Sequence, residues 1–155
     1  MVPKNLTGPS DVGINLDKGS SDEYFKWFIA CLLFGKPVQQ PIAVAAYQTL
    51  DKHRLLSPEK LLDAGWDRLV EVLDEAHYAR YDHDTSTKLL DISSKIKDEY
   101  GSFDGLMKQS EGIDDLGERL REFKGVGPKV LQIFMREAEP RLKDQGWEED
   151  IKQEE

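Results

Sequence analysis

The residues best placed to do chemistry lie between positions 124 and 129. Gly125-Val126-Gly127 separates two runs with helical spacing, and Pro128 suits the first turn of a helix. Glycine adopts positive φ readily and lets a backbone approach another molecule closely. The N–H groups and dipole at the start of the next helix attract an anion, and Lys124 and Lys129 flank that point. The segment is predicted to bind one or two phosphate groups, and the alternative is a glycine turn that serves packing alone.

The elements around this segment are predicted to be helices, because apolar residues recur at spacings of three and four. Caps and breakers such as Ser57-Pro58 and Gly101 set the boundaries. No segment alternates as a strand does, so the fold class is all-α with seven to nine helices. Residues 77–87 are predicted to form a loop. The expected helices cover about 20–35, 39–52, 58–65, 67–76, a segment capped by Asp84 or Asp82 that ends at 100, 103–109, 114–123 and 128–138.

Length and composition narrow the class of protein. The chain has 155 residues, which suits one domain with a real core. A single cysteine, Cys31, excludes an internal disulfide framework and an all-cysteine zinc or iron–sulfur site. The longest apolar run, Trp27 to Phe34, is too short to cross a bilayer, and the N-terminus does not resemble a signal peptide. A cytoplasmic or otherwise intracellular protein is expected, nucleoid-associated or nuclear if it binds DNA. Its oligomeric state is left open.

The formal net charge is −9, which by itself argues against non-specific binding to nucleic acid. The charge is uneven, however, because residues 137–155 carry a net −5 and residues 118–136 carry a net +3. A basic site within an acidic protein therefore remains open. The predicted organisation is a flexible leader over 1–19, a helical domain over 20–138 and an acidic tail over 139–155.

Two segments carry a resemblance to a known family. LREFKGVGPKVLQIFMREA resembles a helix-hairpin-helix and the helix after it, and FIACLLFGKPVQQPIAVAAYQTL resembles the first barrel helix, DNA-inserting loop and second helix of the endonuclease III and 8-oxoguanine glycosylase superfamily. The resemblance covers about residues 20–138, and outside these segments it rests on helix order. It implies a helical barrel that carries the hairpin near its C-terminal end.

The resemblance implies a role in base-excision repair as a DNA glycosylase or abasic-site lyase. Lys129 stands where lyase-competent members have the lysine that attacks the sugar C1′ of a flipped nucleotide. The family's aspartate, normally within V-D-x-H, is replaced here by the window DQGWEED. Asp144 is the first candidate for the acidic role and Asp150 the second, with a solvated acidic tail as the alternative for both.

The resemblance also implies which residues contact double-stranded DNA, damaged or abasic. The predicted DNA-binding residues are Lys124, Gly125, Val126 and Gly127 in the hairpin, with Gln39 and Gln40 in the inserting loop. Hairpin carbonyls over 123–127 could hold a monovalent cation, and no other cofactor or metal is expected. The loop over 77–87 offers Tyr78 and Tyr81 for stacking on a base.

Two further functions remain open at this point. The fold could be kept without catalysis, as a helix-hairpin-helix module that binds DNA or a protein partner. Alternatively, the chain could be a helical interaction protein with no role in nucleic-acid binding, which the net charge of −9 favours. Binding to DNA at low salt separates these functions from each other.

Overall fold

The computed structural model describes residues 7–148, and within that range it contains seven α-helices and no strand. The predicted all-α class is confirmed. Three 3-10 helices, η1 (Pro9–Val12), η2 (Leu16–Lys18) and η3 (Ala79–Tyr81), complete the element order. The α-helices are α1 (Ser21–Phe34), α2 (Gln40–Lys52), α3 (Pro58–Glu75), α4 (Asp82–Tyr100), α5 (Phe103–Gln109), α6 (Ile113–Arg121) and α7 (Pro128–Asp144).

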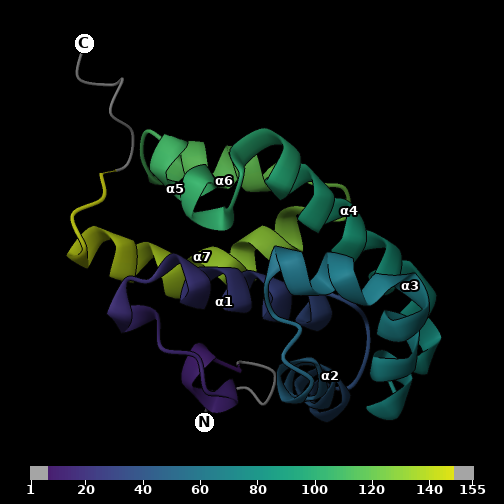
Figure 1. Cartoon of the computed structure of the whole chain (residues 1–155). Coiled ribbons are helices and arrows are strands. Elements are labelled where there is room, and N and C mark those ends of the chain that lie inside the picture. Colours follow the sequence, from purple (N-terminus) through teal and green to yellow (C-terminus); the bar gives the residue numbers. More distant parts are fainter. Residues whose placement is uncertain (1–6, 149–155) are drawn as a thin grey trace, which may run out of the picture.

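Helix α1 forms the centre of the molecule and packs against α2, α5 and α7 (Figure 1). It is apolar nearly all round, and ten of its fourteen residues are buried, as its sequence predicts. Ser20 caps the helix by accepting a hydrogen bond from the Asp22 N–H at 3.2 Å. Trp27 is fully buried, and its indole N–H donates to the Phe134 carbonyl at 3.2 Å. This bond ties the centre of α1 to the centre of α7.

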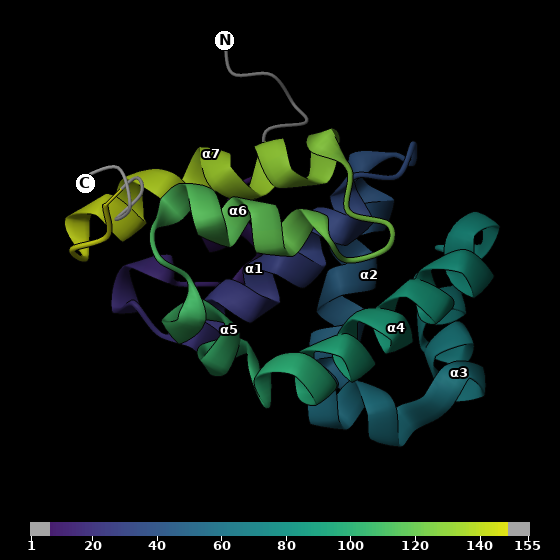
Figure 2. The ribbon, with the colours of Figure 1, turned by 90° about the horizontal axis from the view of Figure 1, so that it is seen from above.

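Helices α3 and α4 pack along each other, and α3 lies on the side of the molecule away from α6 and α7 (Figure 2). Gly65 interrupts α3 with φ 79° and ψ 170°, where the sequence predicts the boundary between two helices. The predicted loop over 77–87 is largely wrong, because α4 already begins at Asp82. Asp82, Thr85 and Ser86 face inward and are buried, so a polar stretch continues as a helix through tertiary packing.

The first and last segments of the described chain also differ from expectation. Residues 7–19, predicted as part of a flexible leader, form η1 and η2 and bury Val12, Ile14 and Leu16 in the core. Their composition is rich in turn residues, but those three apolar side chains decide the outcome. Helix α7 continues past the expected end at Ala138 to Asp144, because Leu142 is also buried.

The 3-10 helix η2 lies against the C-terminal end of α7. Asp17 accepts a hydrogen bond from Arg141 at 3.1 Å, and Gln145 donates to the Leu16 carbonyl at 3.0 Å. Within residues 7–148, no helix is long and apolar enough to span a membrane.

Candidate functional site: a basic cavity beside the glycine hairpin

The hairpin predicted from sequence is formed by the end of α6, the turn over 122–127 and the start of α7. The two helices lie side by side, and the turn that joins them faces the end of the molecule where the α1–α2 loop also lies (Figure 2). The Val126 N–H donates to the Phe123 carbonyl at 3.1 Å and closes the turn. Phe123 and Val126 are buried and anchor it, whereas Lys124 and Lys129 are exposed.

The two glycines of the hairpin have different structural roles. Gly125 has φ +93°, and a Cβ there would lie 2.5 Å from the Cδ of Lys88. Gly127 has φ −100°, and a Cβ there would meet nothing within 4 Å. Gly125 is therefore needed to close the turn beneath Lys88, while Gly127 keeps one face of the hairpin open.

Gly127 also precedes the first turn of α7. No side chain caps this helix end, and Pro128 has no N–H to satisfy. The amides of Lys129 and Val130 therefore have no acceptor within the helix. These donors point out of an open backbone next to an exposed ammonium, an arrangement suited to an anion.

A cavity of about 310 Å³ lies next to the hairpin, between the α1–α2 loop and the first turns of α7. Its polar side chains are cationic or uncharged, and no Asp or Glu occurs among the described residues that line it. These polar residues are Thr7, Lys36, Gln40, Lys129, Gln132 and Arg136. We call this space the hairpin cavity.

The cations of the hairpin cavity differ in how they are held. Arg136 donates to the Thr7 carbonyl at 2.7 Å and to Glu137 at 3.1 Å. Lys36 forms an ion pair with Asp84 and lies over the Tyr81 ring at 5.3 Å. The Lys129 ammonium has no hydrogen bond or ion pair with another residue of the described range 7–148. Among these three cations, Lys129 therefore has the ammonium that is available to bind a ligand.

Asp84 connects the hairpin to the α1–α2 loop. One of its oxygens, Oδ2, accepts from Lys36 and also from Lys88, the latter at 2.8 Å. The Lys36 ammonium, followed by that of Lys88, holds the pKa of Asp84 below its ordinary value. The aliphatic stem of Lys88 in turn lies against Gly125. We call Lys36, Asp84 and Lys88 the lysine bridge.

The structure does not bring the two predicted catalytic residues together. Lys129 stands in the first turn of α7 and Asp144 is its last residue, so they are about 22 Å apart along the helix axis. Two side chains at that separation cannot act on one sugar, and the predicted pairing of Lys129 with Asp144 is wrong. Asp150, the second candidate, lies outside the described residues.

The remaining predicted residues have mixed placements. Gln40 lines the hairpin cavity and donates to the Thr7 hydroxyl at 3.0 Å, and Gln39 is an exposed residue at the start of α2. Tyr78 cannot stack on a base, because it is 1% exposed and its hydroxyl donates to the Leu33 carbonyl at 3.0 Å. The cation at the carbonyls over 123–127 stays a prediction.

Sequence reasoning missed Arg136, Asp84 and the role of Lys36. The i, i+4 spacing of Asp84 and Lys88 was a visible signal for an ion pair on a helix. Nothing in the sequence shows that Lys36, 48 residues before Asp84, completes the bridge.

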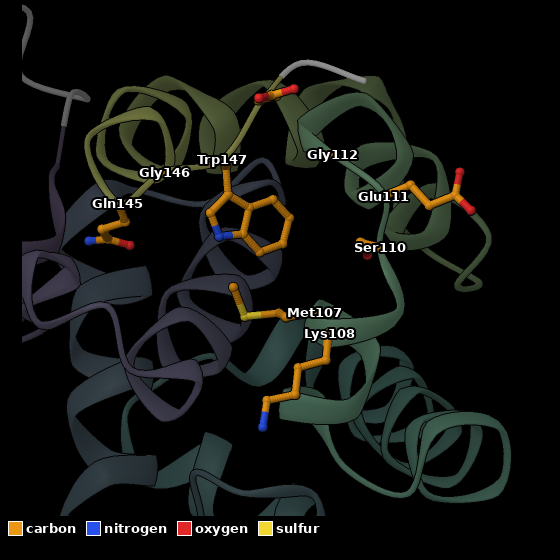
Figure 3. Close-up of a pocket in the computed structure, with 9 residues that line it drawn as sticks. Met107, Lys108, Ser110, Glu111, Gly112, Gln145, Gly146 and Trp147 are labelled. Carbon is orange, nitrogen blue, oxygen red and sulfur yellow. The ribbon is translucent and has the colours of Figure 1, made fainter. Parts of the chain in front are cut away.

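A second cavity, of about 570 Å³, lies at the opposite end of α7. It is bordered by the end of α5, the α5–α6 loop and residues 145–148, and we call it the Trp147 cavity. Figure 3 shows the Trp147 ring and the Met107 side chain projecting toward each other across it. Two of its polar groups hold the fold: the Glu148 carbonyl accepts from the Ile113 N–H at 2.8 Å, and Gln145 accepts from the Tyr24 hydroxyl at 2.9 Å.

Comparison with known proteins identifies no relative of this chain. No family model matches the chain, and no match was found among curated proteins or among solved structures.

Proposed function

We propose that this protein binds double-stranded DNA through the phosphate backbone, with the hairpin over 123–129 as the principal contact. One observation carries the proposal: an open glycine turn with exposed lysines stands beside a cavity whose charged lining is entirely basic. Backbone N–H groups at a helix start and lysine side chains are the usual partners of DNA phosphates. The resemblance to helix-hairpin-helix glycosylases supports the same interpretation and a corresponding barrel-like core.

The acidic net charge does not by itself oppose this function, because no Asp or Glu of the described residues lines the hairpin cavity, although the exposed Glu122 lies in the hairpin turn. Helix α3 carries exposed carboxylates, among them Asp63, Asp67 and Glu71, and it packs on the side away from α6 and α7 (Figure 2). At the hairpin cavity, the nearby carboxylates of Asp84 and Glu137 are already paired with cations. Local charge, rather than net charge, determines where a phosphate chain can lie.

The test is DNA affinity in a charge-matched pair of variants. We expect Lys124→Gln/Lys129→Gln to lower affinity for a blunt duplex of about 20 base pairs roughly tenfold and to reduce the salt slope by about one to two. Lys60→Gln/Lys108→Gln removes the same charge from exposed sites on α3 and α5 and serves as the control. Equal losses in both variants, or no binding at low salt, would contradict the proposal.

Abasic-site lyase activity is a second candidate, because Lys129 lines the hairpin cavity without an ion-pair partner in the described range 7–148. Attack of its neutral amine on the C1′ aldehyde of the ring-opened abasic sugar would form a Schiff base with loss of the aldehyde oxygen as water, and borohydride reduces the C=N bond to a stable amine adduct. A band with abasic duplex that disappears in Lys129→Ala would establish this activity. Binding without a band would restrict the protein to the non-catalytic function or to chemistry that uses water instead of the lysine.

A further inference from the structure

Trp66 stands apart from the other large apolar residues of the described chain. Its 38% exposure makes it the exposed large hydrophobic residue of the part that the structure describes. It follows Gly65, whose φ of 79° breaks α3 and redirects the chain toward α4. A single exposed apolar residue is not by itself a binding site, so the surroundings of the Trp66 ring decide whether it is one.

The Trp66 ring is held in place. Its indole N–H donates to the Thr87 hydroxyl at 3.1 Å, and the His83 ring lies 4.9 Å from it between centroids, tilted by 50°. The His83 side chain is 71% exposed. A ring that is fixed before a ligand arrives loses little entropy on binding, which favours stacking with a planar partner.

His83 and Thr87, which contact the Trp66 ring, are each followed directly on α4 by a member of the lysine bridge, Asp84 and Lys88. His83 and Thr87 are four residues apart on α4, as are Asp84 and Lys88, so the two pairs occupy adjacent strips of the same turns. A helix with its side chains is about 10 Å across, so these strips are within reach of a single nucleotide. Aromatic side chains beside lysines are the usual arrangement for binding unpaired strands.

We propose that Trp66 and His83 form a stacking surface for an unpaired base of a DNA strand whose phosphates contact Lys88 and Lys36. This proposal rests on the proposed function and adds the class of substrate, namely a duplex with a single-stranded extension or gap. Asp67 and Asp84 offset part of the positive charge on this surface. The rings are therefore expected to supply more of the preference than the charges do.

The test compares two duplexes that share one sequence and differ in a four-nucleotide overhang, either thymidines or abasic nucleotides. The wild-type protein should prefer the thymidine overhang by about tenfold, the size of base stacking on an aromatic side chain. Trp66→Leu and His83→Ala should each reduce that preference while leaving blunt-duplex affinity unchanged. Trp66→Phe should keep most of it, because the ring remains available for stacking.

Fluorescence gives a second readout on the same samples. Trp27 is fully buried and Trp147 is half-buried, so quenching by the thymidine overhang should come from Trp66 and disappear in Trp66→Phe. Equal wild-type affinity for the two overhangs would overturn the stacking proposal and leave duplex binding intact. A thymidine preference that persists when Lys124→Gln/Lys129→Gln binds normally would support stacking and overturn the hairpin contact.

Discussion

The two ends of α7 differ in a way that cavity size does not reveal. In the larger cavity, beside Trp147, the Gln145 side chain and the Glu148 carbonyl hold the fold through Tyr24 and Ile113, the one lysine is paired with Asp104, and the other charged side chains of the wall are the carboxylates of Glu111 and Glu148. The smaller hairpin cavity has three cationic side chains in its wall, and one of them, Lys129, has no partner in the described range 7–148. The sign of the charge in the wall, rather than the volume, distinguishes the two cavities as sites for an anion. The variants below change each end separately, except for the first.

Phe134→Ala should have the largest effect and disturb both ends of α7. Phe134 is fully buried, and its ring centroid lies 5.9 Å from that of Phe28. Its carbonyl accepts the hydrogen bond from the Trp27 indole. We expect a loss of about 3–5 kcal/mol in the free energy of unfolding, measured in urea. Gln132→Ala, at an exposed position of the same helix, should change it by less than about 0.5 kcal/mol. Comparable losses would show that α7 is not anchored through its centre.

Gly125→Ala should destabilise the hairpin end alone. Alanine at φ +93° is strained, and its Cβ would displace the Lys88 stem, so a loss of about 1–3 kcal/mol is expected in thermal or urea unfolding. Gly127→Ala is the matched control, because it has an ordinary φ and open space. It should leave stability nearly unchanged but weaken DNA binding if the backbone there approaches a phosphate. A neutral Gly125→Ala would mean that the turn does not require positive φ.

Gln145→Ala should destabilise the opposite end without affecting DNA. The Gln145 side chain accepts from the Tyr24 hydroxyl and donates to the Leu16 carbonyl. Losing both bonds should cost about 1–2 kcal/mol, and Tyr24→Phe should cost about 1 kcal/mol by removing one partner. Burial raises the pKa of Tyr24 to about 12, so this loss should be constant across neutral pH. A fall in DNA affinity in either variant would contradict the separation of the two ends.

Asp84→Asn should have the smallest effect of these variants, and it should raise the affinity for DNA. It removes the anion shared by Lys36 and Lys88, so duplex affinity should rise about threefold at low salt. Asp91→Asn makes the same charge change at another exposed position of α4 and should raise affinity less. Unchanged affinity in Asp84→Asn would show that the lysine bridge does not compete with phosphate.

The same variant has a pH signature. The pKa of Asp84 is lowered in the folded protein, so its carboxylate stabilises the fold above the ordinary value of 3.8, and this contribution is lost as pH falls below that value. The stability difference between wild type and Asp84→Asn should therefore shrink under acid conditions. A difference that persists after the carboxyl group is protonated would point to packing instead.

Sequence reasoning succeeded where a local signal was sufficient. The buried α1, the break at Gly65 and the glycine turn before Pro128 follow from residue types within a few positions. It failed where distant contacts decide, as in the burial of Ile14 and of Tyr78. The pairing of Lys129 with Asp144 failed for a third reason. Asp144 was chosen because it follows Lys129 by the expected number of residues, but all of those residues belong to one continuous helix, which holds the two side chains apart.

The contact between α1 and α7 has a consequence for synthesis of the protein. The most buried helix is synthesised before the helix that covers it, which is the last of the described helices. Until α7 has been made, Trp27 and Phe28 lack their Phe134 partner and remain apolar surface on the growing chain. The native packing of α1 can therefore form only after α7 has been synthesised.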